Sequence, residues 1–501
     1  MDWSNNLEFE QAMTLAQETN VSFFLTGKAG TGKSQFIKEL VENTPDKQFI
    51  KLAPTGTASI NIGGVTIHSF CRFPHRPLVP GDHDIKIFYD QKEKRQMINA
   101  VDTIIIDEVS MLRADIVEGI DTLLKKNTGD YHLPFGGKQI IFVGDLFQLS
   151  PVVRMRSGEG DILKEYYETP YFFSAPALKE NVLPVVELTK SYRQQNPEFL
   201  ALLDHVRTGE ITPKDIKRFN ERVIDSKQES LLRDIITLTT TNRNADTING
   251  KKLEELEGKQ FSYLADIEGE FSSSRFPAPE ELTLKEGAQI MFIKNDIKKV
   301  YKEQRYFNGS IGQITKLTPG SITVRVENGS TFQVELEEWQ NIEYKLEPKT
   351  KKVTSKILGT FKQYPLKLAW AITIHKSQGL TFDKALVDLT SGTFSSGQTY
   401  VALSRVRTFE GLFLRSPIRE NDIFIDHNVV HFAQKFNDQS EIVNSIELGK
   451  ELYEFEKNGD LENAGLHLLK NAIIDVKAKN ISEALKKIRK GYSFVSCDCA
   501  Y

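Results

Sequence analysis

One eight-residue segment near the start of the chain restricts the possible folds more than any other feature. The run Gly27-Lys28-Ala29-Gly30-Thr31-Gly32-Lys33-Ser34 fits the phosphate-binding pattern G-x-x-x-x-G-K-[ST]. An apolar segment at residues 21–25 precedes it and is predicted to be a strand, and residues 35–42 are predicted to be a helix. A strand, a glycine-rich loop and a helix in this order predict an α/β domain that binds phosphate at the N-terminus of the helix.

The residue types in this segment predict how it would hold a nucleotide. Glycines let backbone N–H groups approach phosphates without an intervening Cβ atom, and the helix N-terminus adds partial positive charge. Lys33 is expected to reach the β- and γ-phosphates, and the Ser34 hydroxyl is expected to ligate Mg²⁺. The sequence therefore predicts ATP and Mg²⁺ as cofactors. The predicted contacts in this segment are Gly27, Lys28, Ala29, Gly30, Thr31, Gly32, Lys33 and Ser34.

Three further apolar runs extend the α/β pattern over the first 150 residues. They lie at 49–53, 103–106 and 139–143, and the gaps between them are long enough for the crossovers that parallel strands need. Ligands of parallel sheets sit beyond the carboxyl ends of the strands, so the polar residues that follow these runs should converge on one crevice. A second α/β pattern begins with a strand at 234–240, a helix at 245–256 and a strand at 289–292.

Polar side chains suited to catalysis follow two of these predicted strands. Asp107 and Glu108 end the run at 103–106, where one carboxylate is expected to hold Mg²⁺ and the other to orient and deprotonate the attacking water. Gln148 follows the run at 139–143, in a position to sense the γ-phosphate or align that water. The alternative is a solvated acidic pair and a turn with a polar cap. The phosphate loop upstream favours the catalytic interpretation.

The charge of the chain is unevenly distributed. The formal net charge is −4, which excludes the overall basic balance of a histone-like protein, so nucleic acid could bind only at a local cluster of cations. Residues 291–380 form such a cluster, with 15 Lys and Arg against eight Asp and Glu. Tyr301, Tyr306, Phe307 and Tyr344 are interleaved with these cations and are suited either to stacking on bases or to core packing. A solvated charged face is the alternative for the whole cluster.

Cysteine usage and hydropathy restrict the cellular setting. The three cysteines, Cys71, Cys497 and Cys499, are too few for a disulfide framework and favour a reducing compartment. Cys497 and Cys499 have no second Cys/His pair at zinc spacing, so we interpret them as free thiols. No apolar run approaches the roughly 20 residues of a membrane span, and the first residues do not resemble a secretory signal.

A series of short motifs, in order along the chain, resembles the superfamily 1 helicases. The phosphate loop is followed by APTGTA at 53–58, TIHSF at 66–70, TIIIDEVS at 103–110, VGDLFQLSP at 143–151, LTKSYRQ at 188–194, AITIHKSQGLT at 371–381 and YVALSRVR at 400–407. These segments look like motif Ia with its extension and motifs II to VI. Their order and sequences are similar to those of the branch that contains the PIF, RecD and Dda helicases. The APTGTA and TIHSF pair and the compact length favour the PIF type.

The resemblance implies a fold and its boundaries. Two RecA-like P-loop domains with parallel sheets are expected at residues 1–184 and at residues 185–295 with 358–427. A small SH3-like β domain would be inserted at 296–357, and a helical C-terminal extension would occupy 428–501. Alternating runs at 311–317, 321–326 and 331–336, with glycine-containing turns between them, independently predict antiparallel hairpins in the insertion. The loop at 71–84, rich in Pro and His, is the candidate wedge for splitting a duplex.

The resemblance also implies further site residues. Arg405 would be the arginine finger that reaches the γ-phosphate, Arg193 a second cation, and Gln378 a third group in the same cleft. Gln11 would read the edge of the adenine base. One strand of nucleic acid would be held by Thr55, Gly56, His68 and Phe70 in the first domain and by Thr241, Asn242, His375 and Lys376 in the second. For the two histidines, packing without a ligand is the alternative.

The function implied is an ATP-dependent DNA helicase that moves 5′-to-3′ on single-stranded DNA during replication, repair or recombination. Expected substrates are single-stranded and forked DNA, and the resemblance extends the range to G-quadruplexes and RNA–DNA hybrids; no membrane partner is expected. Two alternatives remain open at this stage, a motor that acts on RNA and a nucleotide-gated clamp that does not unwind. A nuclease is disfavoured because no further carboxylate cluster follows Arg407. We expect a cytoplasmic, nucleoid-associated protein of bacterial type.

Overall fold

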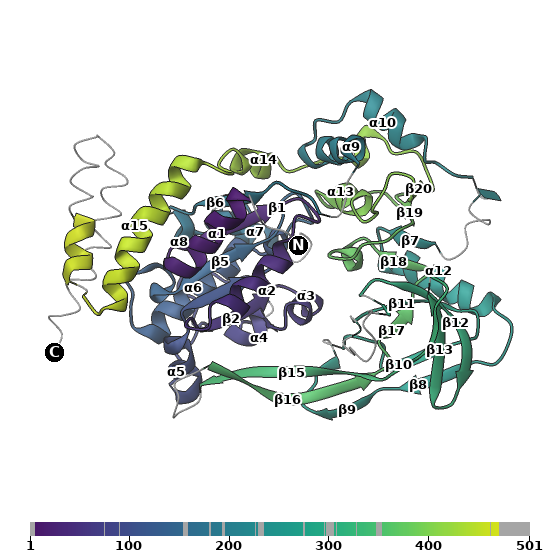
Figure 1. The fold of residues 1–501 in the computed structure, drawn as a ribbon, viewed down its shortest axis with the longest axis horizontal. Coiled ribbons are helices and arrows are strands. Elements are labelled where there is room, and N and C mark those ends of the chain that lie inside the picture. The colour runs from purple at the N-terminus through teal and green to yellow at the C-terminus, as the bar shows by residue number, and fades with distance from the viewer. Residues whose placement is uncertain are drawn as a thin grey trace.

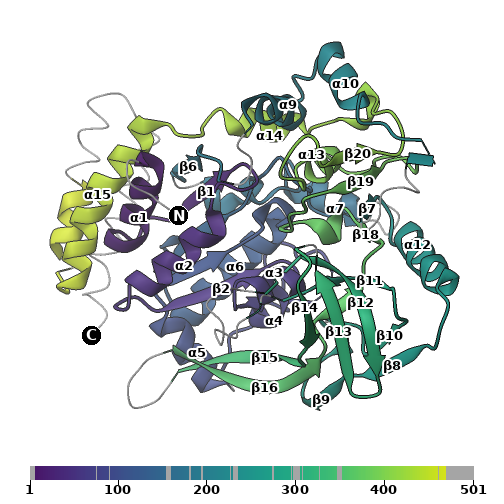
Figure 2. The ribbon, with the colours of Figure 1, turned by 45° about the vertical axis from the view of Figure 1, so that its right-hand side comes forward.

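The fold is that of a computed structural model, in which a large α/β body adjoins a group of antiparallel strands (Figures 1 and 2). The structure describes residues 6–469 except 75, 90, 154–158, 180–181, 193–195, 226, 229–234, 274–275, 295, 297–304, 307, 327, 347–352 and 461. Of the residues named above, Arg193, Tyr301, Phe307, Cys497 and Cys499 lie outside the described part of the chain. Among described residues, no helix has the length and apolar character needed to cross a membrane.

The first domain is built on a six-stranded parallel sheet in the order β3-β2-β4-β5-β1-β6. Its strands are β1 (Phe23–Gly27), β2 (Phe49–Ala53), β3 (Val65–Thr66), β4 (Thr103–Ile106), β5 (Gln139–Val143) and β6 (Val185–Leu188). Its helices are α1 (Leu7–Glu18), α2 (Lys33–Asn43), α3 (Gly56–Asn61), α4 (Ile67–Cys71), α5 (Lys92–Ala100), α6 (Ala114–Thr128), α7 (Glu159–Tyr166) and α8 (Pro176–Lys179). The four strands predicted in this region are confirmed.

The strands of this sheet are apolar throughout because both of its faces are covered. Successive side chains of a strand point to opposite faces. Accordingly, Phe23 and Leu25 pack in a cluster with Phe36 of α2, while Phe24 between them belongs to the cluster that contains Ile120 of α6. A strand buried on both sides has no polar face, which explains why these segments appear as continuous apolar runs in the sequence.

The second domain has a smaller parallel sheet in the order β18-β7-β19-β20. Its strands are β7 (Ile236–Thr239), β18 (Ala371–Thr373), β19 (Ala385–Asp388) and β20 (Leu412–Leu414), and its helices are α9 (Pro197–Thr208), α10 (Pro213–Asn220), α12 (Asn242–Glu255) and α13 (Gln398–Leu403). Two parallel sheets with helices confirm the predicted fold class.

The insertion is larger than predicted and consists of antiparallel sheets of five, three and two strands. It contains β8 (Phe261–Leu264), β9 (Asp266–Gly269), β10 (Glu281–Leu284), β11 (Gln289–Phe292), β12 (Ile311–Thr318), β13 (Ser321–Val326), β14 (Thr331–Val334), β15 (Glu337–Leu346), β16 (Val353–Gln363) and β17 (Leu366–Leu368). The predicted hairpins correspond to β12, β13 and β14. The long hairpin of β15 and β16 was not predicted; it runs along one side of the molecule to α5 of the first domain (Figures 1 and 2).

Strand pairing moves two of the expected domain boundaries. β6 lies within the segment assigned to the second domain, yet it pairs with β1, as Leu25 opposite Val186 shows. β11 was expected in the second parallel sheet, but it pairs antiparallel with β12 and β17, so the insertion begins before residue 296. A short apolar strand carries no local signal of its partner or direction, and for that reason sequence patterns could not settle either boundary.

The described part of the C-terminal extension is helical, as predicted. It contains α14 (His427–Ala433) and α15 (Gln439–Lys457), which form the yellow segment of Figure 1. α15 runs beside α1 in both views, and Gly449 fits where a Cβ atom would lie 2.8 Å from Val21 and 3.0 Å from Thr19. The extension therefore packs against the first domain, far from it in sequence.

Candidate functional site

The phosphate loop connects β1 to α2 and has the backbone that its glycines permit. Gly30 and Gly32 have φ angles of 84° and 95°, a region that favours glycine. At Gly27 a Cβ atom would lie 2.7 Å from the carbonyl oxygen of Leu188, so the loop could not pass so close to β6 with any other residue. The loop that follows β6 also contacts it, because the backbone N–H of Tyr192 donates to Gly30 O at 2.9 Å.

The Lys33 ammonium points back onto this loop. Its Nζ donates to the carbonyl oxygens of Gly27 at 2.6 Å and Lys28 at 3.0 Å. Desolvation by burial lowers the pKa of Lys33, whereas the nearby carboxylates of Asp145 and Glu108 act in the opposite direction. The loop carbonyls thus hold the charge at the position from which it would turn to a phosphate.

The two predicted acidic residues lie together where β4 ends. Both are half-buried, and Glu108 has a left-handed backbone with φ 54°, which is uncommon for a residue with a side chain. Its backbone N–H donates to Asp107 Oδ1 at 2.8 Å. Desolvation and the charge of Glu108 raise the pKa of Asp107 to about 7, and desolvation also raises the pKa of Glu108. Cations and a metal ion would relieve this accumulation of negative charge.

Gln378 of the second domain joins these residues across the cleft. Its Nε2 donates to Glu108 Oε2 at 2.8 Å and to Gln148 Oε1 at 3.2 Å, and Gln148 in turn donates to Asp145 Oδ2 at 3.3 Å. One amide therefore contacts both groups that were predicted to handle the attacking water. The structure brings together four residues predicted from separate motifs: Lys33, Glu108, Gln148 and Gln378.

Asp145, Arg207 and Tyr400 extend this cluster and were not predicted. Asp145 is 1% exposed and accepts hydrogen bonds from Arg207 Nη2 at 3.2 Å and from the Tyr400 hydroxyl at 3.3 Å. Arg207 Nη2 also donates to Glu187 of β6 at 3.0 Å, and the Tyr400 oxygen accepts from the backbone N–H of Ala29 at 3.4 Å. Asp145 and Tyr400 lie inside quoted motifs, so their position was a signal that sequence reasoning could have used. Arg207 has no motif around it.

The predicted finger, Arg405, is fully enclosed within its own domain. It is 1% exposed, and its guanidinium donates to Val401 O at 2.8 Å, to Leu380 O at 3.2 Å and to Ser404 Oγ at 2.8 Å. Burial lowers the pKa of Arg405, while the charge of Glu108 acts in the opposite direction. Arg405 thus lies near Glu108 without a direct contact to the phosphate loop.

The two domains approach each other closely at Gly397. This residue precedes α13 with φ 74°, and a Cβ atom there would lie 2.3 Å from the carbonyl oxygens of Phe147 and Gln148. Ser395 and Ser150 add a contact of 3.1 Å between their hydroxyl oxygens. Only glycine allows the backbone of the second domain to rest on the Gln148 segment at this distance.

The other predicted nucleotide contacts surround this cluster. Lys28 pairs with Asp204 of α9 at 2.6 Å, and Ser34 is exposed in the first turn of α2. Gln11 lies on α1 and is 8% exposed; its Nε2 donates to Gln439 of α15 at 2.7 Å. A hydroxyl at Ser34 and a carboxylate at Asp107 are oxygen ligands of the kind that Mg²⁺ prefers, so the donor set fits this ion.

The residues predicted to hold nucleic acid in the first domain differ in accessibility. Thr55 caps α3, with its hydroxyl accepting from the Ala58 N–H at 3.2 Å, and the space beside Gly56 is open. His68 is half-buried, with its ring 6.5 Å from that of Phe73. Phe70 is 6% exposed and packs in the core, so its ring supports the neighbouring segment and is not available to stack on a base.

The second domain offers a corresponding set. Thr241 caps α12 by accepting from the Asn244 N–H at 3.3 Å, and Asn242 after it is exposed. Lys376 is exposed, while His375 is half-buried and stacks on Phe394 with ring centroids 5.8 Å apart. Desolvation lowers the pKa of His375, which favours the neutral form of its ring. Each domain thus has a threonine-capped helix after a parallel strand, with polar groups at its start.

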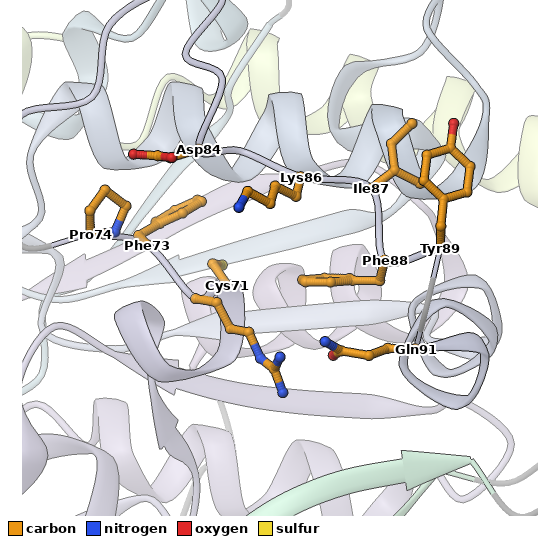
Figure 3. A pocket seen from close by; sticks show the side chains of 10 residues that line it. Cys71, Phe73, Pro74, Asp84, Lys86, Ile87, Phe88, Tyr89 and Gln91 are labelled. Atoms are coloured by element: carbon orange, nitrogen blue, oxygen red, sulfur yellow. The ribbon is translucent and has the colours of Figure 1, made fainter.

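A pocket of about 520 Å³ lies along the predicted wedge loop (Figure 3). Its walls combine the rings of Phe73 and Phe88 with the cation of Lys86 and the carboxylate of Asp84. Lys94, close by, has its ammonium 4.6 Å from the centre of the Phe88 ring. In the insertion, by contrast, Tyr306 is 2% exposed and stacks on Phe292 at 3.9 Å, so it serves core packing.

Comparison with known proteins identifies relatives over most of the chain. Residues 7–217 match the family described as PIF1-like helicase. The chain is 32% identical to the ATP-dependent DNA helicase Pif1 of Bdellovibrio bacteriovorus over 85% of this chain and 91% of that protein. Its structure is similar to Pif1 from Bacteroides sp in complex with ADP-AlF4, with TM-score 0.79 and 36% identity over 87% and 97% of the two chains. Similarity to Bacteroides Pif1 bound to ssDNA has TM-score 0.63 and 37% identity over 88% and 98%.

Proposed function

The chain belongs to the PIF1-like helicase family, and from this premise we propose that it is an ATP-dependent DNA helicase that moves 5′-to-3′ on single-stranded DNA. The observation that carries the proposal is the cross-cleft contact of Gln378 with Glu108 and Gln148. A side chain of one domain that contacts the catalytic carboxylate of the other makes hydrolysis depend on the distance between the domains. Such dependence couples a chemical step to a movement.

The nucleotide would occupy the cleft between these groups. Lys33 would leave the loop carbonyls for the β- and γ-phosphates, and Glu108 would orient the attacking water and accept its proton. Arg405 would supply positive charge to the γ-phosphate from the second domain, and Arg193, which lies outside the described residues, would be a second cation. Gln11 would bind the adenine edge. Ser34 and Asp107 would hold Mg²⁺, which when bound neutralises phosphate charge.

The two threonine-capped helices would hold one strand of DNA. Thr55 and Gly56 in the first domain and Thr241 and Asn242 in the second would bind successive phosphates through backbone N–H groups and side-chain amides and hydroxyls. His68 and the pair His375 and Lys376 would lie along the same strand. Closure on ATP would advance one grip by about a nucleotide, and hydrolysis would let the other follow. Contacts of this kind read phosphates, so sequence preference is expected to be weak.

The loop at 71–84 and its pocket would meet the duplex at a fork. Phe73 and Phe88 of this pocket are buried, but Tyr89 in its lining is 71% exposed and is suited to stack on a base that has left its stack, because stacking on an aromatic face is available to every base. Forked DNA is therefore part of the proposed substrate range, together with quadruplexes and RNA–DNA hybrids. We place the protein in a bacterial-type cytoplasm near the nucleoid, where single-stranded DNA arises; fractionation of cells with a tagged chain tests this location.

The decisive experiment is ATP-dependent unwinding of two partial duplexes, one with a 5′ single-stranded tail and one with a 3′ tail. We expect unwinding of the 5′-tailed substrate only. Lys33→Ala is the control, since loss of the ammonium removes phosphate binding and should abolish unwinding. DNA-stimulated ATP hydrolysis without unwinding of either substrate would contradict the proposal and indicate a clamp. A matched pair of RNA duplexes in the same assay distinguishes a DNA motor from an RNA motor.

A further inference from the structure

The contact between Gln11 and Gln439 connects the C-terminal extension with the proposed base end of the nucleotide site. Gln439 is the first residue of α15 and follows the helix cap Asp438. Its Oε1 accepts a hydrogen bond from Gln11 Nε2 at 2.7 Å. Among described residues, no donor contacts Gln11 Oε1, although this atom is buried. A buried carbonyl oxygen without a donor destabilises the folded protein, and a ligand with an N–H group would relieve this.

The extension holds Gln439 in place through several independent contacts. Asn437 has φ 54° and bonds to the edge of β6: its N–H donates to Val185 O at 3.0 Å, and its side-chain Oδ1 accepts from the Glu187 N–H at 2.7 Å. The Phe432 ring stacks on Phe173 with centroids 4.3 Å apart. Ile442, three residues beyond Gln439, is fully buried in the same core cluster as α1. Gln439 therefore approaches Gln11 from a fixed position.

We propose that Gln439 is a positioning residue that orients the amide of Gln11, so that the C-terminal extension sets the preference of the motor for adenine nucleotides. This inference rests on the proposed function of Gln11. With Nε2 directed to Gln439, Oε1 is the amide group left to accept a hydrogen bond from the base, which must first displace the packing that buries this oxygen. Adenine presents an N6 amino donor beside N7, whereas guanine presents the O6 acceptor at the same place. An oriented Gln11 carbonyl accepts from adenine and repels guanine.

Two substitutions at position 439 test this proposal, because only one of them is expected to change the preference for ATP. Gln439→Glu retains only acceptors, so it keeps Nε2 of Gln11 turned toward α15 and should preserve the preference for ATP over GTP. Gln439→Lys offers only donors, so it should attract Oε1 of Gln11 and turn Nε2 toward the base. We expect the ratio of kcat/KM for ATP to that for GTP to fall by about tenfold in Gln439→Lys, the size of one buried hydrogen bond lost and one repulsion gained.

Matched variants separate orientation from a general structural effect. Gln434→Lys introduces the same charge at an exposed glutamine of the extension and should leave the ratio unchanged. Gln439→Ala should raise KM for ATP by about 2- to 10-fold with little change in kcat, because it removes the orienting bond without disturbing the reacting groups. In a Gln11→Ala background, Gln439→Lys should have no further effect on the ratio, since there is no amide left to turn.

The measurements are DNA-stimulated hydrolysis of ATP and GTP by the full chain and equilibrium binding of ADP and GDP to the same variants. The expected order of the ratios is Gln439→Glu equal to the unsubstituted chain and Gln439→Lys lowest. Equal ratios in all three would overturn the inference and leave Gln439 with a structural role, as would a fall in Gln434→Lys of the same size. Binding does not require turnover, so a chain without ATPase activity, which contradicts the proposed function, still gives the ratio that decides this inference.

Discussion

The two domains that flank the proposed nucleotide site hold the cations expected at the γ-phosphate in the same way. Lys33 on one side and Arg405 on the other each donate to peptide carbonyls of their own domain. The contacts between the domains are made by the neutral side chains of Gln378 and Tyr400 and also by ion pairs, Lys28 with Asp204 and Arg207 with Asp145. In this structure hydrogen bonds and ion pairs hold the domains together, while Lys33 and Arg405 stay bound to carbonyl oxygens of their own domains. A triphosphate would supply the negative charge that draws both cations inward.

Substitution of Arg405 should have the largest effect on ATP hydrolysis. We expect Arg405→Lys to lower DNA-stimulated ATP hydrolysis by about 10³-fold or more, because a lysine cannot reproduce the planar guanidinium of an arginine finger. ATP binding at equilibrium should change far less. Hydrolysis and nucleotide binding are measured on the same preparation. A loss below tenfold would assign the finger role to another cation, of which Arg207 is the described candidate beside Asp145.

Substitution of Glu108 tests its expected role as the base that accepts the proton of the attacking water. Glu108→Gln should reduce hydrolysis by about 10²- to 10⁴-fold, since an amide cannot accept the proton of the attacking water. The hydrogen bond from Gln378 should survive, because the new side chain still offers an oxygen. Single-turnover hydrolysis with bound DNA measures the step. Full activity of this variant would exclude Glu108 as the base.

Substitution of Gln378 tests how much its hydrogen bonds to Glu108 and Gln148 contribute to catalysis. Gln378→Ala removes the bonds to Glu108 and Gln148, one of them to a charged acceptor, so we expect kcat to fall by about tenfold or somewhat more. Gln378→Glu is the matched variant, and repulsion between its carboxylate and Glu108 should produce a larger loss. If both variants hydrolyse ATP normally but unwind poorly, the link serves movement and not chemistry.

The raised pKa of Asp107 predicts a smaller effect that depends on pH. Because its folded-state pKa of about 7 exceeds the ordinary value of 3.8, the stabilisation from protonated Asp107 is present below about pH 4 and is lost as pH rises through 7. Without nucleotide or Mg²⁺, Asp107→Asn should therefore gain thermal stability over the unsubstituted chain as pH increases from 4 to 8. Thermal unfolding at several pH values measures the difference. A constant difference would mean that Asp107 ionises normally in the folded protein.

Much of this cleft could be predicted because its residues lie in short motifs at the ends of apolar strands. Lys33, Asp107, Glu108 and Gln148 converge as expected from the rule for parallel sheets. Arg207, Gly397 and Gln439 could not be found in this way, since each acts through a partner far along the chain and no local pattern specifies that partner. The hairpin of β15 and β16 was not predicted for a related reason. Its alternation of polar and apolar residues is also typical of exposed segments, and the contacts with β9 and α5 that support its length are distant in sequence.

The two structural comparisons differ although their sequence identities are nearly equal. The TM-score is 0.79 for the ADP-AlF4 complex and 0.63 for the relative bound to ssDNA, at 36% and 37% identity. Divergence in sequence cannot account for this gap. We attribute it to a different arrangement of the same parts. Unliganded Pif1 from Bacteroides sp has a TM-score of 0.77, so the arrangement seen here corresponds more closely to the ADP-AlF4 complex and to the unliganded relative than to the relative bound to ssDNA.

The reach of the β15–β16 hairpin to α5 has a kinetic meaning. A DNA strand held between the two α/β domains and the insertion would be surrounded by protein once the β15–α5 contact is made. Escape would then depend on arrival at a free end or on the lifetime of the β15–α5 contact, and not on the equilibrium affinity of the groove. The distance that the protein moves along DNA before dissociation would then depend on the lifetime of the β15–α5 contact. The same protein could therefore bind DNA weakly and still move far along it.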